Sequence, residues 1–199
     1  MDDFKKFLEG RRTIYALGKD VSISESEIEK VISQSIKYVP SAFNMQSQKV
    51  VLLLNKNHDQ MWDIVMETLR KIVPAESFAK TETKINAFKS AYGTVLFFND
   101  DAVTKKYGDD FPLYRENFIR WSEQQNGMLQ YAIWVGLSNL NLGASLQHYN
   151  PLIDAEVKRV FNIPASWSLI AQMPFGEKHG EADSDKSFLP IEERLLIKR

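Results

Sequence analysis

The apolar residues between positions 24 and 38 recur at the spacing of a helix. Ser24-Glu25-Ser26-Glu27 has the S-x-x-E form of a capping box, which satisfies the free amide groups at a helix start. Behind it, apolar and small residues share one face, at Ile28, Val31, Ile32, Ser35 and Ile36. Pro40 must follow the end of this helix, because a proline pushes the preceding residue out of helical dihedrals. The pattern therefore predicts an amphipathic helix from Ser24 to Tyr38.

The rest of the chain alternates between short apolar runs and helical stretches. The apolar runs predict four buried strands, at Lys49–Asn55, Gly93–Asn99, Ala144–Gln147 and Trp167–Met173. Helices are expected at Asp2–Glu9, Asp59–Ile72, Ala75–Ser90 and, in shorter pieces around Pro112, within Asp101–Gln125. A further helix is expected from Asn150 to Phe161, with Asn150 as its N-cap and Pro151 as its first helical residue. Strands interleaved with helices indicate an α/β or α+β domain, with helices on both faces of a small mixed sheet.

Two segments of the C-terminal half have unusual patterns. Asn126–Leu142 is apolar on nearly every side, and a helix without a polar face is buried in the core or against another chain. The last segment, Lys186–Arg199, alternates poorly and carries no helix stop. We expect it to form an extended arm.

Length and charge narrow the classes of function. A chain of 199 residues suits a single domain spanning residues 1–199. With 25 Lys and Arg against 26 Asp and Glu, its net charge of −1 argues against a general nucleic-acid binder. No apolar run approaches the roughly 20 residues that cross a bilayer, and the charged N-terminus lacks the apolar stretch of a signal peptide. We therefore expect a cytoplasmic protein that does not enter a membrane.

The absence of certain residue types and motifs from the sequence excludes several kinds of chemistry. The chain has no Cys, which excludes disulfides, thiolate metal sites, iron–sulfur clusters and a cysteine nucleophile. Neither G-x-x-x-x-G-K-[ST] nor G-x-G-x-x-G occurs, and neither Ser41 nor Ser47 lies in a nucleophile elbow. His58, His148 and His179 are too scattered to predict a metal site. His58 and His179 are expected at the surface.

Two polar segments could carry chemistry of their own. Arg11-Arg12-Thr13 suits a dianionic phosphate, which arginine binds through paired hydrogen bonds, but for this segment alone a solvated basic turn is the preferred interpretation. Pro40–Ser47 is dense in amide and hydroxyl groups. Asn44 and Gln46 could bind the edge of a heterocycle, or the polar side chains could cap their own backbone. Each segment taken alone favours the structural interpretation over the binding site.

Taken together and in order, these segments resemble the flavin-dependent nitroreductase family. A helix precedes R-R-[ST], and a second helix ends in P-S-x-x-N-x-Q before a buried strand. Three segments further along the chain also resemble the family. Trp134–Ala144 resembles its central dimer helix, Leu169–Gly176 resembles the strand that follows, and Lys186–Glu193 resembles its C-terminal K-x-x-x-P-x-E-E run. More narrowly, Ser145–Pro151 and Glu192-Glu193-Arg194 resemble the compact branch named for the fatty-acid repression mutant proteins.

The resemblance implies an α+β fold, with a small, mainly antiparallel sheet between helices, and FMN bound non-covalently at a homodimer interface. Arg11 and Arg12 would hold the phosphate and ribityl chain, and Thr13 would add a hydroxyl contact. The isoalloxazine would be lined by Ser41, Asn44 and Gln46, with Asn44 near N5. The remaining cofactor contacts would come from the backbone around Gln147 and His148 and from the tail cations Lys186 and Arg194.

The chain departs from the family pattern at three places. Tyr15 replaces a second basic residue near the flavin pyrimidine, and Phe188 replaces a second tail cation, for which Arg194 is the substitute. Gln147 and His148 stand where many relatives have two small residues, which changes the floor of the pocket.

The implied function is an FMN-dependent NAD(P)H oxidoreductase, with NADH or NADPH as hydride donor and a nitroaromatic, quinone or similar electrophile as acceptor. The flavin carries this chemistry, so no side chain is expected to be catalytic and no metal is expected. Tyr114, Phe118 and Trp121 share one helical face and could form the wall over the flavin, or belong to the ordinary core. The alternatives are a non-catalytic flavin-binding or regulatory relative, and a stress-linked interaction protein without a cofactor.

Overall fold

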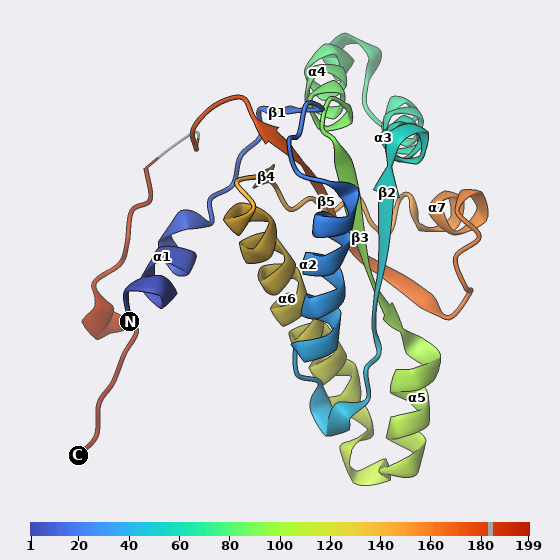
Figure 1. Ribbon diagram of the computed structural model, residues 1–199. Helices are drawn as coiled ribbons and strands as arrows, with labels where there is room; N and C mark the ends of the chain where they lie inside the picture. Colours follow the sequence, from blue (N-terminus) through green and yellow to red (C-terminus); the bar gives the residue numbers. More distant parts are fainter. Residues whose placement is uncertain (183–184) are drawn as a thin grey trace.

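An antiparallel sheet runs through the middle of the protein (Figure 1). The computed structural model describes residues 1–182 and 185–199. In these residues the strand order is β1-β5-β3-β2, with β4 also paired to β5, and every strand pair is antiparallel. The strands are β1 (Leu17–Gly18), β2 (Gln48–Leu54), β3 (Gly93–Asp100), β4 (Gly143–Ala144) and β5 (Trp167–Lys178). Thr13 adds an isolated parallel bridge to Ala144.

Helices cover both faces of the sheet, which confirms the expected α+β class. The helices are α1 (Asp2–Gly10), α2 (Glu25–Tyr38), α3 (Asn55–Arg70), α4 (Phe78–Lys89), α5 (Asp101–Asp110), α6 (Arg115–Asn139) and α7 (Asp154–Val160). Short 3-10 turns lie at Ala42–Asn44, Ala75–Ser77, Pro112–Tyr114 and Ile191–Glu193. None of the helices in the described part of the chain combines the length and apolarity that a membrane crossing requires.

The core has two halves because successive side chains of a strand point to opposite faces. On β3, Leu96 and Phe98 pack beneath α3, α4 and α7, while Val95 and Phe97 pack beneath α2 and α6. Both faces of β3 are therefore dry, which explains its uninterrupted apolar sequence.

The first predicted helix is confirmed together with its cap. The Glu27 amide donates to Ser24 Oγ (3.3 Å), and the Ser24 amide donates to Glu27 Oε2 (3.1 Å). The helix ends at Tyr38, before Pro40. Both signals are local, so the sequence contained all the information they need.

The predicted helix start at Asn150-Pro151 is wrong. The peptide bond between these residues is cis, residues 150–153 form turns, and α7 begins only at Asp154. Asn150 does not cap a helix, because its Oδ1 accepts a hydrogen bond from Gln172 Nε2 (3.4 Å). The local pattern assigned the Asn150 side chain to a helix cap, but it is hydrogen bonded to Gln172, which lies 22 residues further along the chain.

His58 is also not a surface residue. It lies on the buried side of α3, is 1% exposed, and both of its ring nitrogens are hydrogen bonded. Nε2 lies 3.1 Å from the Lys89 carbonyl, which can only accept, so Nε2 carries the proton and Nδ1 accepts from Thr94 Oγ1 at 2.8 Å. Burial lowers the pKa of His58 below its ordinary value, and the residue is a neutral core histidine. His179, by contrast, is exposed as predicted.

The apolar stretch Asn126–Leu142 corresponds to the C-terminal half of the longer helix α6. One side, with Leu129, Ile133 and Leu137, is buried against the sheet. On the other side Met128 and Tyr131 remain more than 40% exposed in the single chain. One helix thus has both an inner and an outer apolar face.

The tail beyond residue 185 runs beside α1, away from the sheet, and confirms the predicted extended arm (Figure 1). Its apolar side chains are exposed, with Phe188 at 77% and Leu196 at 76%. Helix α1 contains no buried residue. These two outer segments therefore have little packing of their own within one chain.

Candidate functional site

Arg11 and Arg12 lie where α1 meets the C-terminal end of α6. Ser138 Oγ on α6 donates to the Gly10 carbonyl (3.1 Å), which fixes the end of α1. The guanidinium carbon of Arg11 lies 4.4 Å from the ring centroid of Trp134, also on α6. Both arginines are half-buried, and Thr13 is held by its bridge to Ala144. The backbone here is irregular, as two adjacent arginines need if they are to face one ligand.

Lys186 from the tail shares the electrostatic field of the two arginines. Partial loss of solvent and the charges of Arg11 and Arg12 lower the pKa of Lys186 below its ordinary value. Three cations gathered in this way repel one another, and an anion between them would relieve the repulsion. We call Arg11, Arg12 and Lys186 the cation end of the site. Arg194 is exposed elsewhere in the tail, after the turn at Ile191–Glu193.

A cavity of about 310 Å³ adjoins the cation end. Arg12, Ser138, Lys178 and the carboxylates Glu181 and Asp185 are among the residues that line it. Lys178 is the last residue of β5, and its Nζ donates to Asn141 Oδ1 (3.1 Å). Sequence analysis missed Lys178, because β5 extends five residues beyond the predicted strand end at Met173.

The Pro40–Ser47 loop lies at the other end of α6. Phe43, Asn44 and Gln46 all have left-handed backbone conformations, with φ of 53°, 53° and 52°. The Gln46 amide donates to Ser41 Oγ (3.1 Å), and Gln46 Nε2 donates to the Asn44 carbonyl (3.2 Å). Ser41 and Gln46 thus partly cap their own loop, while the Asn44 side chain is exposed. We call this loop the amide end of the site.

A buried polar group on α6 supports the amide end, and sequence analysis missed it. Gln125 is 1% exposed, accepts from the Ala42 amide (3.1 Å) and donates to Ser47 Oγ (2.6 Å). Asn126 is fully buried and donates to the Phe98 carbonyl and to Asn99 Oδ1, both at 2.9 Å. In the sequence these residues are indistinguishable from a solvated face of a helix.

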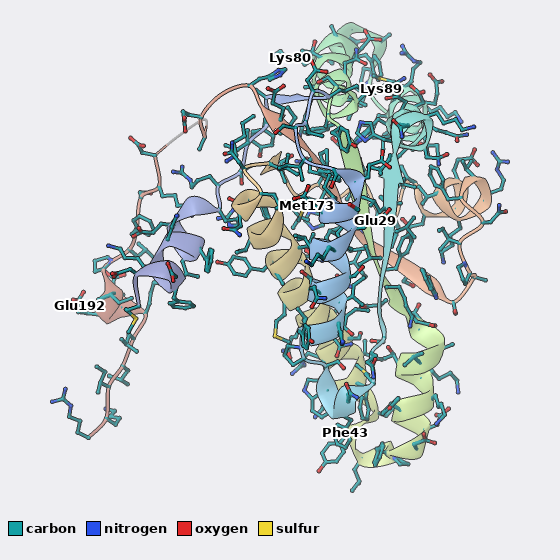
Figure 2. The ribbon with its side chains drawn as sticks, viewed as in Figure 1. Glu29, Phe43, Lys80, Lys89, Met173 and Glu192 are labelled. Carbon is teal, nitrogen blue, oxygen red and sulfur yellow. The ribbon has the colours of Figure 1, made fainter. Side chains whose placement is uncertain are left out.

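Aromatic rings gather around Phe43, which is labelled at the lower end of the molecule in Figure 2. Its ring centroid lies within 5.0–6.2 Å of four other rings, those of Phe111, Tyr114, Phe118 and Trp121. Phe118 is fully buried inside this cluster, whereas Tyr114 is 45% and Phe43 is 52% exposed. The three predicted wall residues therefore do lie together, but Phe118 belongs to the core and Phe43 presents the accessible ring.

Gln147 and His148 follow β4. The Gln147 backbone pairs with Gln172 through hydrogen bonds of 2.7 and 2.9 Å, and its side chain donates to Ser145 Oγ (3.1 Å). Gln147 is 7% exposed and His148 is exposed. This segment is firmly attached to β5 by its backbone.

The cation end and the amide end are separated along α6. Arg11 contacts Trp134 and Gly10 contacts Ser138, whereas the loop contacts Gln125. At 1.5 Å per residue, these contact points are about 14–20 Å apart along the helix axis. A single chain therefore holds the two groups of predicted ligands at opposite ends of one helix.

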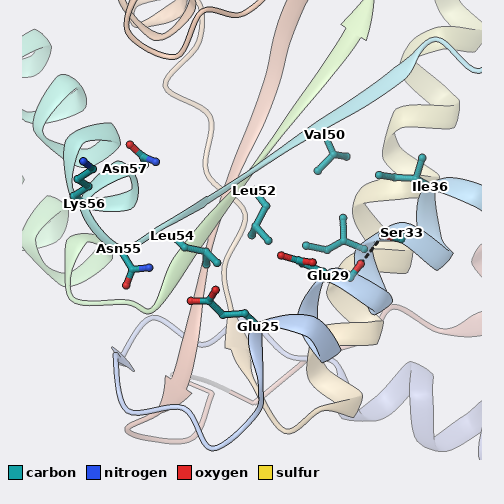
Figure 3. Close-up of a pocket in the computed structure, with 11 residues that line it drawn as sticks. Glu25, Glu29, Ser33, Ile36, Val50, Leu52, Leu54, Asn55, Lys56 and Asn57 are labelled. Atoms are coloured by element: carbon teal, nitrogen blue, oxygen red, sulfur yellow. Dashed lines mark hydrogen bonds between the residues drawn. The ribbon is translucent and has the colours of Figure 1, made fainter.

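A groove runs along the free edge of the sheet. Its volume is about 590 Å³, and it lies between α2 and β2, the outermost strand of the sheet (Figure 3). The half-buried side chains of Val50, Leu52 and Leu54 form one wall, and Glu25 and Glu29 of α2 stand opposite (Figure 3).

Comparisons with known proteins agree with this architecture. A sequence model described as the nitroreductase family matches residues 8–177. HBN1 of Saccharomyces cerevisiae is 38% identical over 175 residues, 87% of this chain and 86% of HBN1. The nitroreductase FRM2 of the same yeast is 30% identical over 168 residues, 83% of each chain.

Solved structures show the same fold. The nitroreductase CinD from Lactococcus lactis, in complex with chloramphenicol or with 4-nitrophenol, is 40% identical with a TM-score of 0.90, covering 98% of this chain and 100% of CinD. A Desulfovibrio desulfuricans protein solved with FMN, 18% identical, shares the fold with a TM-score of 0.70 over 98% of this chain and 96% of its own.

The family model and the yeast relatives each cover most of the chain, and FRM2 represents the branch named for the fatty-acid repression mutant. Membership of this family supports the assignment of the chain as an oxidoreductase. The chain belongs to the nitroreductase family, in the branch that includes FRM2.

Proposed function

We propose that the chain is an FMN-dependent NAD(P)H oxidoreductase that reduces nitroaromatic, quinone or similar electrophilic acceptors. The observation that carries the proposal is the gathering of Arg11, Arg12 and Lys186 into one cationic group, in a member of this family. The complexes of CinD with chloramphenicol and 4-nitrophenol support the acceptor class, and the FMN complex of the Desulfovibrio protein supports the cofactor.

The residues of the cation end fit a flavin phosphate. Guanidinium groups bind phosphate through paired, charge-assisted hydrogen bonds. Partial burial and the charges of Arg11 and Arg12 lower the pKa of Lys186, and an anion would offset these charges. Thr13 would donate a hydroxyl to the same group, and Arg194 would join when the tail is in place.

The residues of the amide end fit a flavin ring. Ser41, Asn44 and Gln46 present donors and acceptors of the kind that the edge of an isoalloxazine requires. The Asn44 side chain is exposed, as are those of its left-handed neighbours Phe43 and Gln46, and we assign Asn44 to the polar edge near N5. The backbone of Gln147 and His148 would form the floor beneath the ring.

FMN, when bound, supplies hydride transfer from a reduced nicotinamide to the acceptor. The part of the protein is to orient the reactants, exclude water and tune charge around the ring. We assign no acid or base to a side chain. Tyr114 and Trp121, together with the exposed ring of Phe43, would form the wall that shields the reactants from solvent.

We further propose that two copies complete each site. A twofold axis across α6 sets two copies of this helix antiparallel, so the cation end of one faces the amide end of the other. The outer apolar face of α6 and the unburied helix α1 supply the surface that such a dimer would cover.

The tail of one copy would then lie in the β2 groove of the other. An unpaired outer strand accepts a further strand through its backbone, and the tail residues Leu195–Ile197 match the apolar wall of the groove. Lys198 and Arg199 carry positive charges that complement the negative charges of Glu25 and Glu29. A chain truncated after Pro190 should then dissociate into monomers at a higher protein concentration than the full chain in size-exclusion chromatography, and an unchanged dissociation of the dimer would contradict this docking.

The absorbance spectrum of the purified protein tests the main proposal. A flavin spectrum that bleaches with NADH or NADPH and returns on addition of 4-nitrophenol or a quinone is expected. A colourless protein that takes up no added FMN would overturn the flavin assignment. Bound FMN without turnover would instead identify a non-catalytic relative.

A further inference from the structure

We propose that Gln125 is a positioning residue, which holds the Pro40–Ser47 loop in the shape that presents Ser41, Asn44 and Gln46 to the ligand. The identity of the ligand rests on the proposed function. The link between Gln125 and the loop rests on the geometry alone.

One carboxamide group joins the two ends of the loop. Gln125 Oε1 accepts from the Ala42 amide at 3.1 Å, and Gln125 Nε2 donates to Ser47 Oγ at 2.6 Å. The side chain is 1% exposed, so water does not compete for either bond. Gln125 therefore restrains the distance between Ala42 and Ser47, because one side chain is bonded to both residues.

The loop between these positions needs such a restraint. Phe43, Asn44 and Gln46 adopt left-handed conformations, which residues with a Cβ rarely populate. Backbone of this kind persists only where its surroundings over-determine it. The hydrogen bonds within the loop run between near neighbours, whereas Gln125 connects it to helix α6.

Gln125 is itself well anchored. The next residue, Asn126, donates hydrogen bonds to the Phe98 carbonyl and to Asn99 Oδ1 of β3. These bonds fix the rotation of α6 relative to the sheet. The end of the loop is fixed as well, because the Asp100 amide donates to the Ser47 carbonyl (2.8 Å).

Three variants separate positioning from general stability. Gln125→Met keeps the length of the side chain and removes both bonds to the loop. Gln125→Glu keeps an acceptor for Ala42 and offers a second oxygen to the Ser47 hydroxyl. Gln130→Met is the matched control, since Gln130 is also buried on α6 but is bonded to Asn126 and not to the loop.

The first measurement is hydrogen exchange of the Asn44, Met45 and Gln46 amides, which are bonded within the loop. It uses the full chain without added flavin, at matched stability. Exchange should accelerate by at least about tenfold in Gln125→Met, because both hydrogen bonds to the loop are lost. Gln125→Glu should restore most of the protection, and Gln130→Met should remain near wild type. Equal exchange in Gln125→Met and Gln130→Met would overturn the proposal.

The second measurement is the affinity of the full chain for FMN and for riboflavin, with the absorbance spectrum of each complex. Gln125→Met should weaken both flavins by the same factor and shift the spectrum, because the loop faces the ring and not the phosphate. An unaltered spectrum and affinity would contradict the positioning role. If the wild-type chain bound no flavin, the proposed function would fail, and the exchange measurement would still decide the role of Gln125.

Discussion

The two ends of the candidate site are built in opposite ways. The amide end is a strained loop attached to the core by buried hydrogen bonds from Gln125 and Ser47. The cation end consists of half-buried and exposed side chains from the irregular segment after α1 and from the tail, which bury little within one chain. A flavin ring requires fixed geometry, whereas a phosphate requires charge that can adjust around it. The contrast suggests that the fold pre-organises the ring site and leaves the phosphate site to be completed by ligand and partner.

The largest expected effect concerns stability. Asn126→Leu removes the partner of the Phe98 carbonyl, Asn99 and Gln130 inside the core, so the free energy of unfolding should fall by about 2–3 kcal/mol. The control at the cation end is Ser138→Ala, which removes a partly exposed bond to Gly10 and should change the same quantity by less than about 0.5 kcal/mol. Urea unfolding measures both. Similar losses in the two variants would remove the contrast between the ends.

The sequence predicted the parts of this site that depend on near neighbours. The capped helix before Pro40, the Arg11-Arg12 pair and the P-S-x-x-N-x-Q loop are all local signals. Gln125 and Phe43 were missed because their roles depend on partners far along the chain. A glutamine on a helix is indistinguishable from a solvated residue until the loop that it holds is known.

The same limit explains the corrections. His58 has the polarity of a surface residue, but Thr94 and the Lys89 carbonyl, more than 30 residues away, satisfy its ring nitrogens in the core. Phe118 shares a helical face with Trp121, yet Phe43 covers it from another segment. Burial of a side chain is decided by tertiary packing, which periodicity does not contain.

The second prediction tests whether Arg11 binds the phosphate of FMN or its ring. Arg11→Ala should weaken FMN by about 1.5–3 kcal/mol, through the loss of a charge-assisted phosphate contact, and leave riboflavin affinity unchanged. Lys30→Ala, at an exposed position of α2, removes the same charge from a residue that belongs to neither end of the site and should alter neither affinity. Titration of flavin fluorescence measures both ligands. A parallel loss of riboflavin would assign Arg11 to the ring instead.

The third prediction uses pH at the cation end. In the free protein partial burial and the charges of Arg11 and Arg12 lower the pKa of Lys186, and a bound phosphate would raise it again. The contribution of Lys186 to FMN affinity should therefore be complete below the lowered pKa and decline as pH rises through it, before the ordinary lysine value. In Lys186→Arg the affinity should stay flat over this range, because arginine remains charged. The same decline in wild type and Lys186→Arg would exclude Lys186 as its source.

The smallest expected effect concerns Trp134, which stacks against Arg11 at 4.4 Å. An aromatic face attracts a guanidinium by about 0.5–1 kcal/mol at a partly exposed site, so Trp134→Leu should weaken FMN by roughly two- to fivefold. Trp134→Phe keeps a ring face and should lose less. The decisive measurement is a double-mutant cycle with Arg11→Ala, in which Trp134→Leu should have no further effect on FMN affinity once the guanidinium is absent. An additive loss would mean that Trp134 acts through the packing of α6 and not through Arg11. Non-additive losses would instead show that Arg11, at the cation end, takes its orientation from a single residue of α6.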